Sequence, residues 1–223
     1  MNRKLFAQAI IKFLSGLLLV GFLLFVPAGS FAYRNAWLLI GLLFIPMFAA
    51  GIVLMFRSPD LLRKRLNAKE KHSAQKKVLL GSGVMFLLGF LLAGFNYRFG
   101  WFMLPSGVVL AASAVFLLAY LMYAEVLREN TYLSRTVEVQ ENQRVIDTGL
   151  YGLVRHPMYT ATMLLFLSMP LVLGSLFSFL IFCIYPFLIA ERIRNEEALL
   201  EKELPGYAEY KAKVKYKMLP FVW

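Results

Sequence analysis

The chain alternates long apolar runs with shorter polar stretches. Runs of roughly 18 or more apolar residues are typical of helices that cross a membrane, because about 20 residues at 1.5 Å each span a hydrocarbon core of about 30 Å. Four runs reach this length, at about residues 5–26, 35–56, 79–97 and 101–127. The pattern therefore predicts four transmembrane helices within residues 1–127.

A fifth apolar stretch, residues 157–190, is too long for a single span. As one helix it would extend about 51 Å, well beyond a hydrocarbon core. Pro170 and Gly174 lie near its middle and divide it into halves of about 14 to 16 residues, which are short for full spans. We therefore predict a helical hairpin that enters the membrane and returns to the same side, so that the chain has six apolar segments.

The composition is that of a membrane protein. Hydrophobic residues make up 60% of the chain, charged residues 17%, and the mean hydropathy is +0.65. The longest polar stretches, residues 57–78, 128–156 and 191–217, are each too short to bury a core of their own. We predict one all-α, membrane-embedded domain over residues 1–223, in which residues 128–217 hold a cofactor-binding loop, the hairpin and a C-terminal amphipathic helix.

The basic residues indicate how the chain is oriented. Of the 24 Lys and Arg residues, only Arg34 and Arg98 fall between runs one and two or between runs three and four, and Lys12 lies inside run one. The other 21 lie in the tails and in the alternate loops, as the positive-inside rule predicts for a multi-pass protein with both termini in the cytoplasm. The net charge of +11 then faces anionic membrane lipids rather than nucleic acid.

The N-terminal run also has a second interpretation. Arg3 and Lys4, the apolar stretch after them and "GSFA" at 29–32 together resemble a signal peptide with a small-x-small cleavage site. Because the run is long and a second span follows directly, an uncleaved first helix is the favoured reading.

Two polar segments have local patterns of their own. Residues 57–77 are dense in charge and are either a short interfacial helix or a plain topogenic loop, with His72 exposed to solvent. Residues 136–148 start with alternating apolar and polar positions and then reach Glu141 and Asn142, a pair suited to a turn. That pattern predicts a short hairpin or an extended loop.

Metal and disulfide chemistry have no candidates in this sequence. Cys183 is the single cysteine, so no intrachain disulfide can form. His72 and His156 are the only histidines and lie far apart, so we predict no metal site.

Polar residues gather where the hairpin should begin and end. Pro157 suits the first position of a helix, which places His156 near its N-cap, where backbone N–H groups favour a carboxylate or phosphate. Tyr159 lies three residues on and should share a face with His156. Glu196 and Glu197, across the hairpin, would receive ammonium or ribose hydroxyl groups. The alternative is structural: a capping histidine, an interfacial tyrosine and a solvated acidic pair.

The same residues carry a family resemblance. "GLYGLVRHPMY" at 149–159, the hydrophobic hairpin, and then "EEALL" and "GYAEY" resemble the isoprenylcysteine carboxyl methyltransferase family, which is related to phospholipid N-methyltransferases. The shared pattern is R-H-P-x-Y, then E-E-x-x-L, then a Gly and two Tyr. It covers about residues 136–217; over the first three runs the likeness is one of hydropathy alone.

The resemblance implies S-adenosylmethionine as methyl donor, bound at the cytosolic interface without a Rossmann fold. It places Arg192 near the reacting carboxylate as an acceptor-positioning catalytic residue. Two departures stand out: the loop after Gln140 is shorter than in eukaryotic members, and Pro205-Gly206 replaces the usual Phe-Gly. The cofactor-binding positions that it implies are Gln140, Gln143, Val145, Ile146, Tyr151, His156, Pro157, Tyr159 and Glu196.

The resemblance also frames the reaction. It implies a lipophilic acceptor, either a small molecule or a lipidated group, and the R-x-x-x-E spacing of Arg192 and Glu196 favours a carboxylate such as a prenylcysteine-like group. A carboxylate needs no general base, whereas the amine of a phospholipid headgroup does, and Glu197 or Glu125 would be the candidates. A nicotinamide-dependent sterol-type reductase and a small transporter or scaffold are the remaining alternatives.

Overall fold

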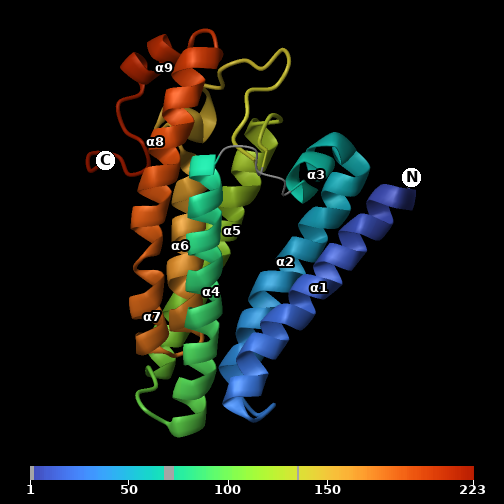
Figure 1. Ribbon diagram of the computed structural model, residues 1–223, viewed down its shortest axis with the longest axis vertical. Coiled ribbons are helices and arrows are strands. Elements are labelled where there is room, and N and C mark those ends of the chain that lie inside the picture. Colours follow the sequence, from blue (N-terminus) through green and yellow to red (C-terminus); the bar gives the residue numbers. More distant parts are fainter. Residues whose placement is uncertain (1–2, 68–72, 135) are drawn as a thin grey trace.

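The computed structural model describes residues 3–67, 73–134 and 136–223, and within these ranges the regular elements are helices (Figure 1). An antiparallel bridge joins Met103 to Ser175. The elements are α1 (Arg3–Ala28), α2 (Arg34–Arg57), α3 (Pro59–Leu66), α4 (Ser73–Phe99), α5 (Ser106–Glu129), the short 3-10 helix η1 (Gly149–Gly152), α6 (Pro157–Val172), α7 (Leu176–Phe182), α8 (Tyr185–Glu203) and α9 (Tyr207–Lys213).

The prediction of an all-helical, multi-pass membrane protein is confirmed. In the described part of the chain, five helical segments are long and apolar enough to cross a membrane. Four of them are α1, α2, α4 and α5, which correspond to the four predicted runs. The fifth runs from Leu176 to Glu203 through α7 and α8, while α6 is a shorter apolar helix.

The fifth apolar stretch folds into the predicted hairpin. α6 is the first arm, and α7 and α8 form the returning arm. The turn between them lies at Gly174, whose φ of 72° is in the left-handed region that favours glycine. Pro170 lies inside α6, close to its C-terminal end, and the helix ends two residues later. The predicted division near Pro170 and Gly174 is therefore confirmed.

The returning arm is longer than its predicted 14 to 16 residues. α8 continues past residue 190 to Glu203, so the amphipathic helix expected to start after the hairpin is the second half of α8. The arm is interrupted instead at Cys183 and Ile184. Pro186 lies in the first turn of α8; proline lacks an N–H and clashes with the carbonyl four residues earlier, so it interrupts the helix just before itself. Beyond Pro186 no further breaker occurs until Pro205.

The segment after α2 contains a short helix, in agreement with the first of the two interpretations. α3 starts with Pro59 at its first turn and has Asp60 near its N-terminus, where a negative charge interacts favourably with the helix dipole. Its last turn is basic, which suits the other end of the dipole. The expectation that His72 is exposed falls on residues outside the described part of the chain.

Residues 136–148 form an extended loop. Asn142 has φ of 56°, and the N–H of Gln143 donates to the carbonyl of Gln140 at 3.1 Å, which closes the predicted turn at Glu141 and Asn142. No strand is assigned within this segment, so of the two predictions the extended loop is confirmed.

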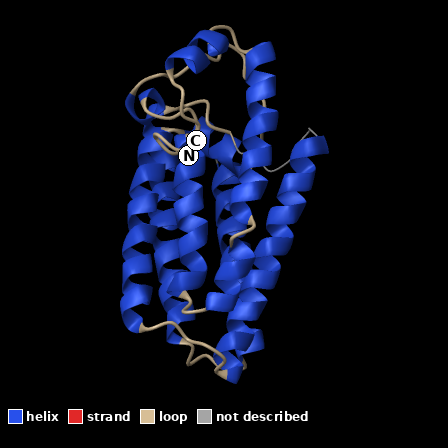
Figure 2. Cartoon of the chain, turned by 90° about the vertical axis from the view of Figure 1, so that its left-hand side faces the viewer, coloured by secondary structure: helices blue, strands red, loops and turns tan. Residues whose placement is uncertain are grey.

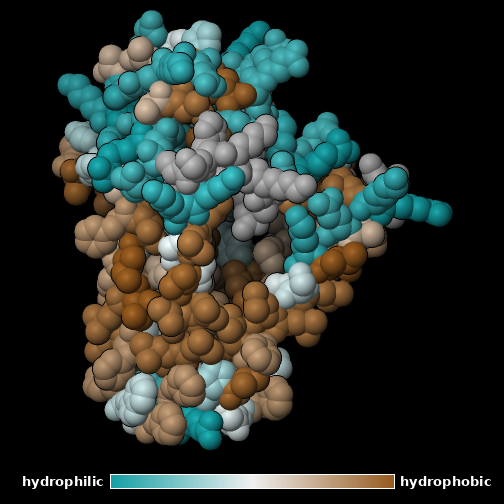
Figure 3. All heavy atoms as spheres, in the orientation of Figure 1, coloured by the Kyte–Doolittle hydropathy of each residue, from teal (hydrophilic) through white to brown (hydrophobic). Residues whose placement is uncertain are grey.

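The polar and apolar parts of the molecule are separated along its long axis. Polar residues gather over α3, α9 and the adjoining loops at the upper end, and apolar residues form the broad band below (Figure 3). Both termini lie toward that upper end, as the views in Figures 1 and 2 agree. The basic segments 57–67 and 211–217 lie there too, so these positively charged segments, which are far apart in the sequence, are gathered at one end of the molecule.

α1 and α2 pack on the remaining helices mainly through their lower halves. Apart from Leu5, the buried residues of α1 lie between Leu23 and Ala28, and those of α2 lie between Ala36 and Phe44. The space-filling view shows a hollow between this pair and α4, below the polar end (Figure 3). The two upper halves therefore diverge from the rest of the bundle.

Candidate functional site

A cavity lies at the polar end, where the loop after α5, the start of α6, the end of α8 and α9 meet. Its empty volume is about 840 Å³, counting the open mouth. Eight of the ten residues named from the sequence line it: Gln143, Val145, Ile146, Tyr151, His156, Tyr159, Arg192 and Glu196. The tertiary structure therefore gathers most of the predicted site around one space.

Gln140 and Pro157 are the two predicted residues that do not line the cavity. Pro157 is buried at the first position of α6, where its ring starts the helix. Gln140 donates from its side-chain nitrogen to the carbonyl of Tyr132, and its backbone N–H donates to Oε1 of Gln143 at 2.9 Å. Gln140 thus supports Gln143, which does line the cavity.

The start of α6 has the predicted geometry. His156 is the N-cap residue, and its side chain makes no capping hydrogen bond. Its ring stacks against the ring of Tyr159, with centroids 5.7 Å apart and planes inclined by 28°. Gly149, with φ of 53°, begins η1 and turns the chain toward this helix.

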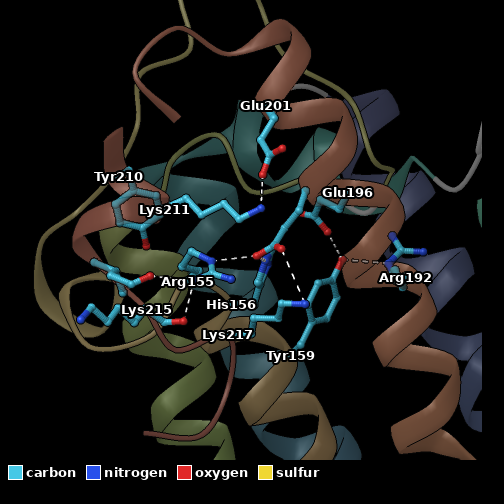
Figure 4. Close-up of polar contacts among 12 residues, drawn as sticks. Arg155, His156, Tyr159, Arg192, Glu196, Glu201, Tyr210, Lys211, Lys215 and Lys217 are labelled. Atoms are coloured by element: carbon cyan, nitrogen blue, oxygen red, sulfur yellow. Dashed lines mark hydrogen bonds and ion pairs between the residues drawn. The ribbon is translucent and has the colours of Figure 1, made fainter. Parts of the chain in front are cut away.

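Tyr159 joins the two arms of the hairpin (Figure 4). Nε of Arg192 donates to the hydroxyl oxygen of Tyr159 at 2.9 Å, and that hydroxyl donates in turn to Oε2 of Glu196. Arg192 and Glu196 lie one turn apart on α8, so both reach the same phenol. The guanidinium carbon of Arg192 also lies 5.9 Å from the centre of the tyrosine ring.

Glu197 has a different position from the one expected. It is buried, and its Oε1 accepts hydrogen bonds from Nε of Arg155 at 2.7 Å and from Nε2 of His156 at 3.1 Å. Nζ of Lys217 lies 3.8 Å from the other oxygen. Successive helical residues point about 100° apart, so Glu196 can line the cavity while Glu197 packs behind its wall. The expectation that both acids serve a ligand is therefore wrong for Glu197.

α9 and the end of α8 close the cavity with an apolar cluster. Leu204, Tyr207, Tyr210 and Val214 pack together with three partly buried residues, Val139, Val145 and Leu200. The hydroxyl of Tyr210 donates to the carbonyl of Tyr151 at 2.7 Å, and burial raises the pKa of Tyr210 above its usual value. This contact ties α9 to η1, just before the hairpin.

Tyr207 differs from its neighbour. Its hydroxyl is buried and lacks a hydrogen-bond partner among the described residues, although the side chain lines the cavity. Burial, and then the negative charges of Glu197 and Glu196, raise its pKa, so the phenol stays protonated. A buried hydroxyl without a partner is costly, which makes this oxygen a natural contact for a ligand.

Several lining residues were not found from the sequence. Asn130, Arg155, Tyr207 and Tyr210 line the cavity, and the "GYAEY" motif was the available signal for Tyr207 and Tyr210. Behind the wall, Nε2 of the buried Gln75 on α4 donates to the carbonyl of Arg192 at 3.2 Å. No local pattern marks such a contact between helices more than a hundred residues apart.

Comparisons with known proteins bear on the second half of the chain. No curated protein matches it. A family model matches residues 108–202, from the first turn of α5 almost to the end of α8, and so includes the hairpin and most of the cavity wall. That model describes the isoprenylcysteine carboxyl methyltransferase (ICMT) family, and the match confirms that residues 108–202 of this membrane protein resemble that methyltransferase family.

Proposed function

We propose that this protein is a membrane-bound methyltransferase that transfers a methyl group from S-adenosylmethionine to a carboxylate on a lipophilic acceptor. The observation that carries the proposal is the contact set of Arg192, Tyr159 and Glu196, which sets a cation, a phenol and a carboxylate on one wall of the cavity. The family match over the same residues supports it independently.

The chemistry of the lining fits the proposed cofactor. S-adenosylmethionine, when bound, supplies a methyl group on a sulfonium sulfur, which a carboxylate oxygen can displace. The tyrosine rings at 151, 159, 207 and 210 offer π faces that attract a cationic centre. Glu196 is an acceptor for ammonium or ribose hydroxyl groups, and the hydroxyl of Tyr207 is a buried polar atom that a ligand would satisfy.

Arg192 is the proposed binding group for the acceptor. A guanidinium presents its N–H donors in a planar fork that matches a carboxylate. Its bond to Tyr159 sets the orientation of that fork, and Glu196 sets the orientation of Tyr159 in turn. Fixed donors of this kind lower the barrier by holding the nucleophile in place without reorganisation during the reaction.

The lipid part of the acceptor would approach from the hollow between α2 and α4 (Figure 3). α3 lies beside the polar end of this hollow. Arg65 of α3 donates to the carbonyl of Ser134 at 3.1 Å and lies 3.9 Å from the sulfur of Met158, and both residues line the cavity. The contact links the apolar side of the molecule to the site.

The alternative of an amine acceptor is less well supported. It needs a general base, and the two residues considered for that role are engaged elsewhere. Glu125 forms an ion pair with Arg128 on the surface of α5 and does not line the cavity, and Glu197 is bound to Arg155 and His156. The proposed carboxylate acceptor needs neither residue as a base.

Calorimetry with S-adenosylhomocysteine, the demethylated product, tests the proposal on purified protein. We expect binding by the wild type and a loss of about 10-fold or more in affinity for Glu196→Ala, because a charge-assisted hydrogen bond is removed. Glu201→Ala, a substitution at an exposed position outside the cavity, is the matched control and should bind as the wild type. No binding by the wild type would contradict the methyltransferase assignment.

A further inference from the structure

The segment of residues 214–218, which we call the C-terminal strap, is bound to the start of α6 mainly through its backbone. Its carbonyl oxygens accept from the main chain at residues 155 and 156 and from two buried side chains. The hydrogen bonds are Arg155 N to Tyr216 O (2.9 Å), His156 N to Lys217 O (2.8 Å), Arg155 Nη1 to Val214 O (2.7 Å) and Lys215 O (2.8 Å), and Thr160 Oγ1 to Met218 O (2.8 Å).

The strap is also held in place at both of its ends. Val214 is buried in the apolar cluster of α9, and Met218 is buried in the main core between the helices. Each end is thus fixed by apolar burial, and the carbonyls between them are presented to residues 155–160. The strap lies next to the residues that carry the proposed site but contributes none of the cavity lining.

The contacts around His156 indicate which of its ring nitrogens carries a proton. A carboxylate only accepts hydrogen bonds, so the Nε2 that lies 3.1 Å from Oε1 of Glu197 must carry a proton. The same carboxylate oxygen accepts from Nε of Arg155, whose guanidinium is held in turn by two strap carbonyls. In the neutral ring the proton on Nε2 leaves Nδ1 as the acceptor.

We propose that Arg155, Thr160 and the C-terminal strap are positioning groups that, through Glu197, hold His156 as its Nε2–H tautomer and present Nδ1 to a donor group of the ligand. The inference rests on the proposed function, in which His156 contacts the cofactor. It assigns to the strap a role in the site although no strap residue touches the cavity. The ligand group concerned is an N–H or O–H donor, such as an ammonium or a hydroxyl.

Thr160 provides the sharpest test because it does not line the cavity and acts only through its neighbours. Its hydroxyl donates to Met218 O and lies 3.4 Å from the carbonyl of His156. Thr160→Val keeps the shape and removes both contacts, whereas Thr160→Ser keeps the hydroxyl. Arg155→Met removes the guanidinium that joins Glu197 to the strap carbonyls of residues 214 and 215, and Lys215→Ala changes an exposed side chain while keeping the carbonyl.

The first measurement is the long-range 1H–15N spectrum of the histidine ring in full-length protein at pH 8. His72→Gln is introduced in every sample, so that His156 is the single histidine. We expect the parent, Thr160→Ser and Lys215→Ala to show one ring species protonated at Nε2. Thr160→Val and Arg155→Met should show a mixture of the two tautomers. A parent ring protonated at Nδ1, or a Thr160→Val spectrum identical to that of the parent, would overturn the inference.

The second measurement is the affinity for S-adenosylhomocysteine of the same proteins. Thr160→Val should weaken binding about 5-fold and Arg155→Met about 20-fold, with recovery in Thr160→Ser. Affinity of Thr160→Val within two-fold of the parent would overturn the link to the ligand. Should Arg155→Met fail to fold, the Thr160 pair decides the result. Should the parent not bind the product at all, the proposed function fails, and the ring spectra still decide whether the strap sets the tautomer.

Discussion

Arg192 on α8 and Tyr159 on α6 face each other across the hairpin, with Nε 2.9 Å from the phenol oxygen. The two residues are 33 positions apart in the chain; Tyr159 lies in the first turn of the largely apolar α6, and Arg192 lies where α8 changes from apolar to charged residues. Because Glu196 accepts from the same phenol, the contact fixes the rotation of α8 relative to α6 at the depth where the cavity begins.

The first prediction concerns the planar fork of Arg192. Arg192→Lys keeps the charge but removes the bidentate geometry, so we expect kcat to fall about 100-fold with a smaller change in KM. A labelled-methyl assay with a farnesylcysteine analogue measures this. Arg194→Lys is the control, because Arg194 is exposed and pairs only with Glu191 on the surface among its described partners. An equal fall in both variants would contradict the assignment.

Glu196 and Glu197 are adjacent but should respond in opposite ways to substitution. Glu197→Ala leaves Arg155 buried without its carboxylate and should lower the free energy of unfolding by about 3 kcal/mol, the usual cost of breaking a buried ion pair. Glu196→Ala should change stability by less than about 1 kcal/mol and act on ligand affinity instead. Unfolding in detergent, followed by circular dichroism, compares the two. Similar losses of stability in the two variants would contradict the assignment of Glu197 to folding and Glu196 to ligand binding.

Tyr207→Phe should separate stability from binding. The substitution removes a buried hydroxyl without a partner among the described residues, so we expect the ligand-free protein to be stabilised by about 1 kcal/mol. The same change should weaken S-adenosylhomocysteine binding about 5-fold. Tyr210→Phe breaks the bond to the carbonyl of Tyr151 and should destabilise the protein. If Tyr207→Phe binds the product as tightly as the wild type does, the hydroxyl of Tyr207 does not contact the ligand.

A surface ion pair gives a pH-dependent prediction. Nζ of Lys213 lies 2.7 Å from Oδ2 of Asp147, and this hydrogen bond, followed by the charge of Lys213, holds the pKa of Asp147 below its ordinary value of 3.8. A lowered folded-state pKa contributes stability that is present above 3.8 and is lost as the pH falls through the lower folded value. The difference in unfolding midpoint between wild type and Asp147→Asn should therefore shrink as the pH is lowered below 3.8, and also in high salt.

The orientation in the membrane can be tested by labelling. In a Cys183→Ser background, Phe31→Cys places one thiol in the loop between α1 and α2, which lies at the lower end of the molecule, and Lys215→Cys places one in the segment after α9, at the polar end. The positive-inside rule predicts that an impermeant maleimide added to intact cells labels position 31 and not position 215. Permeabilised cells should show labelling at both. The reverse pattern would put the termini and the site outside the cytoplasm.

The hydropathy of the chain was enough to determine its helices. Apolar runs of spanning length have no low-energy alternative to a helix in a membrane, because their backbone groups must be satisfied within the segment. Gly174 similarly marks the hairpin turn through its positive φ, and Pro157 marks the first turn of α6. The break before Pro186 was not predicted, although a proline at that position is a signal for it.

The "RHPMY" motif was sufficient to locate the start of α6 and to place His156 beside Tyr159. The division of labour between Glu196 and Glu197 depended on the tertiary structure. Neighbouring positions on a helix differ by about 100° in direction, so the choice follows from how α8 is rotated against α6, which packing along the whole hairpin sets.

The C-terminal strap was decided by the tertiary structure alone. Its bonds to Arg155, His156 and Thr160 are made by carbonyl oxygens, which every residue has. Contacts of that kind leave no side-chain pattern, so they emerge only when the folded chain brings residues 214–218 back to the start of α6.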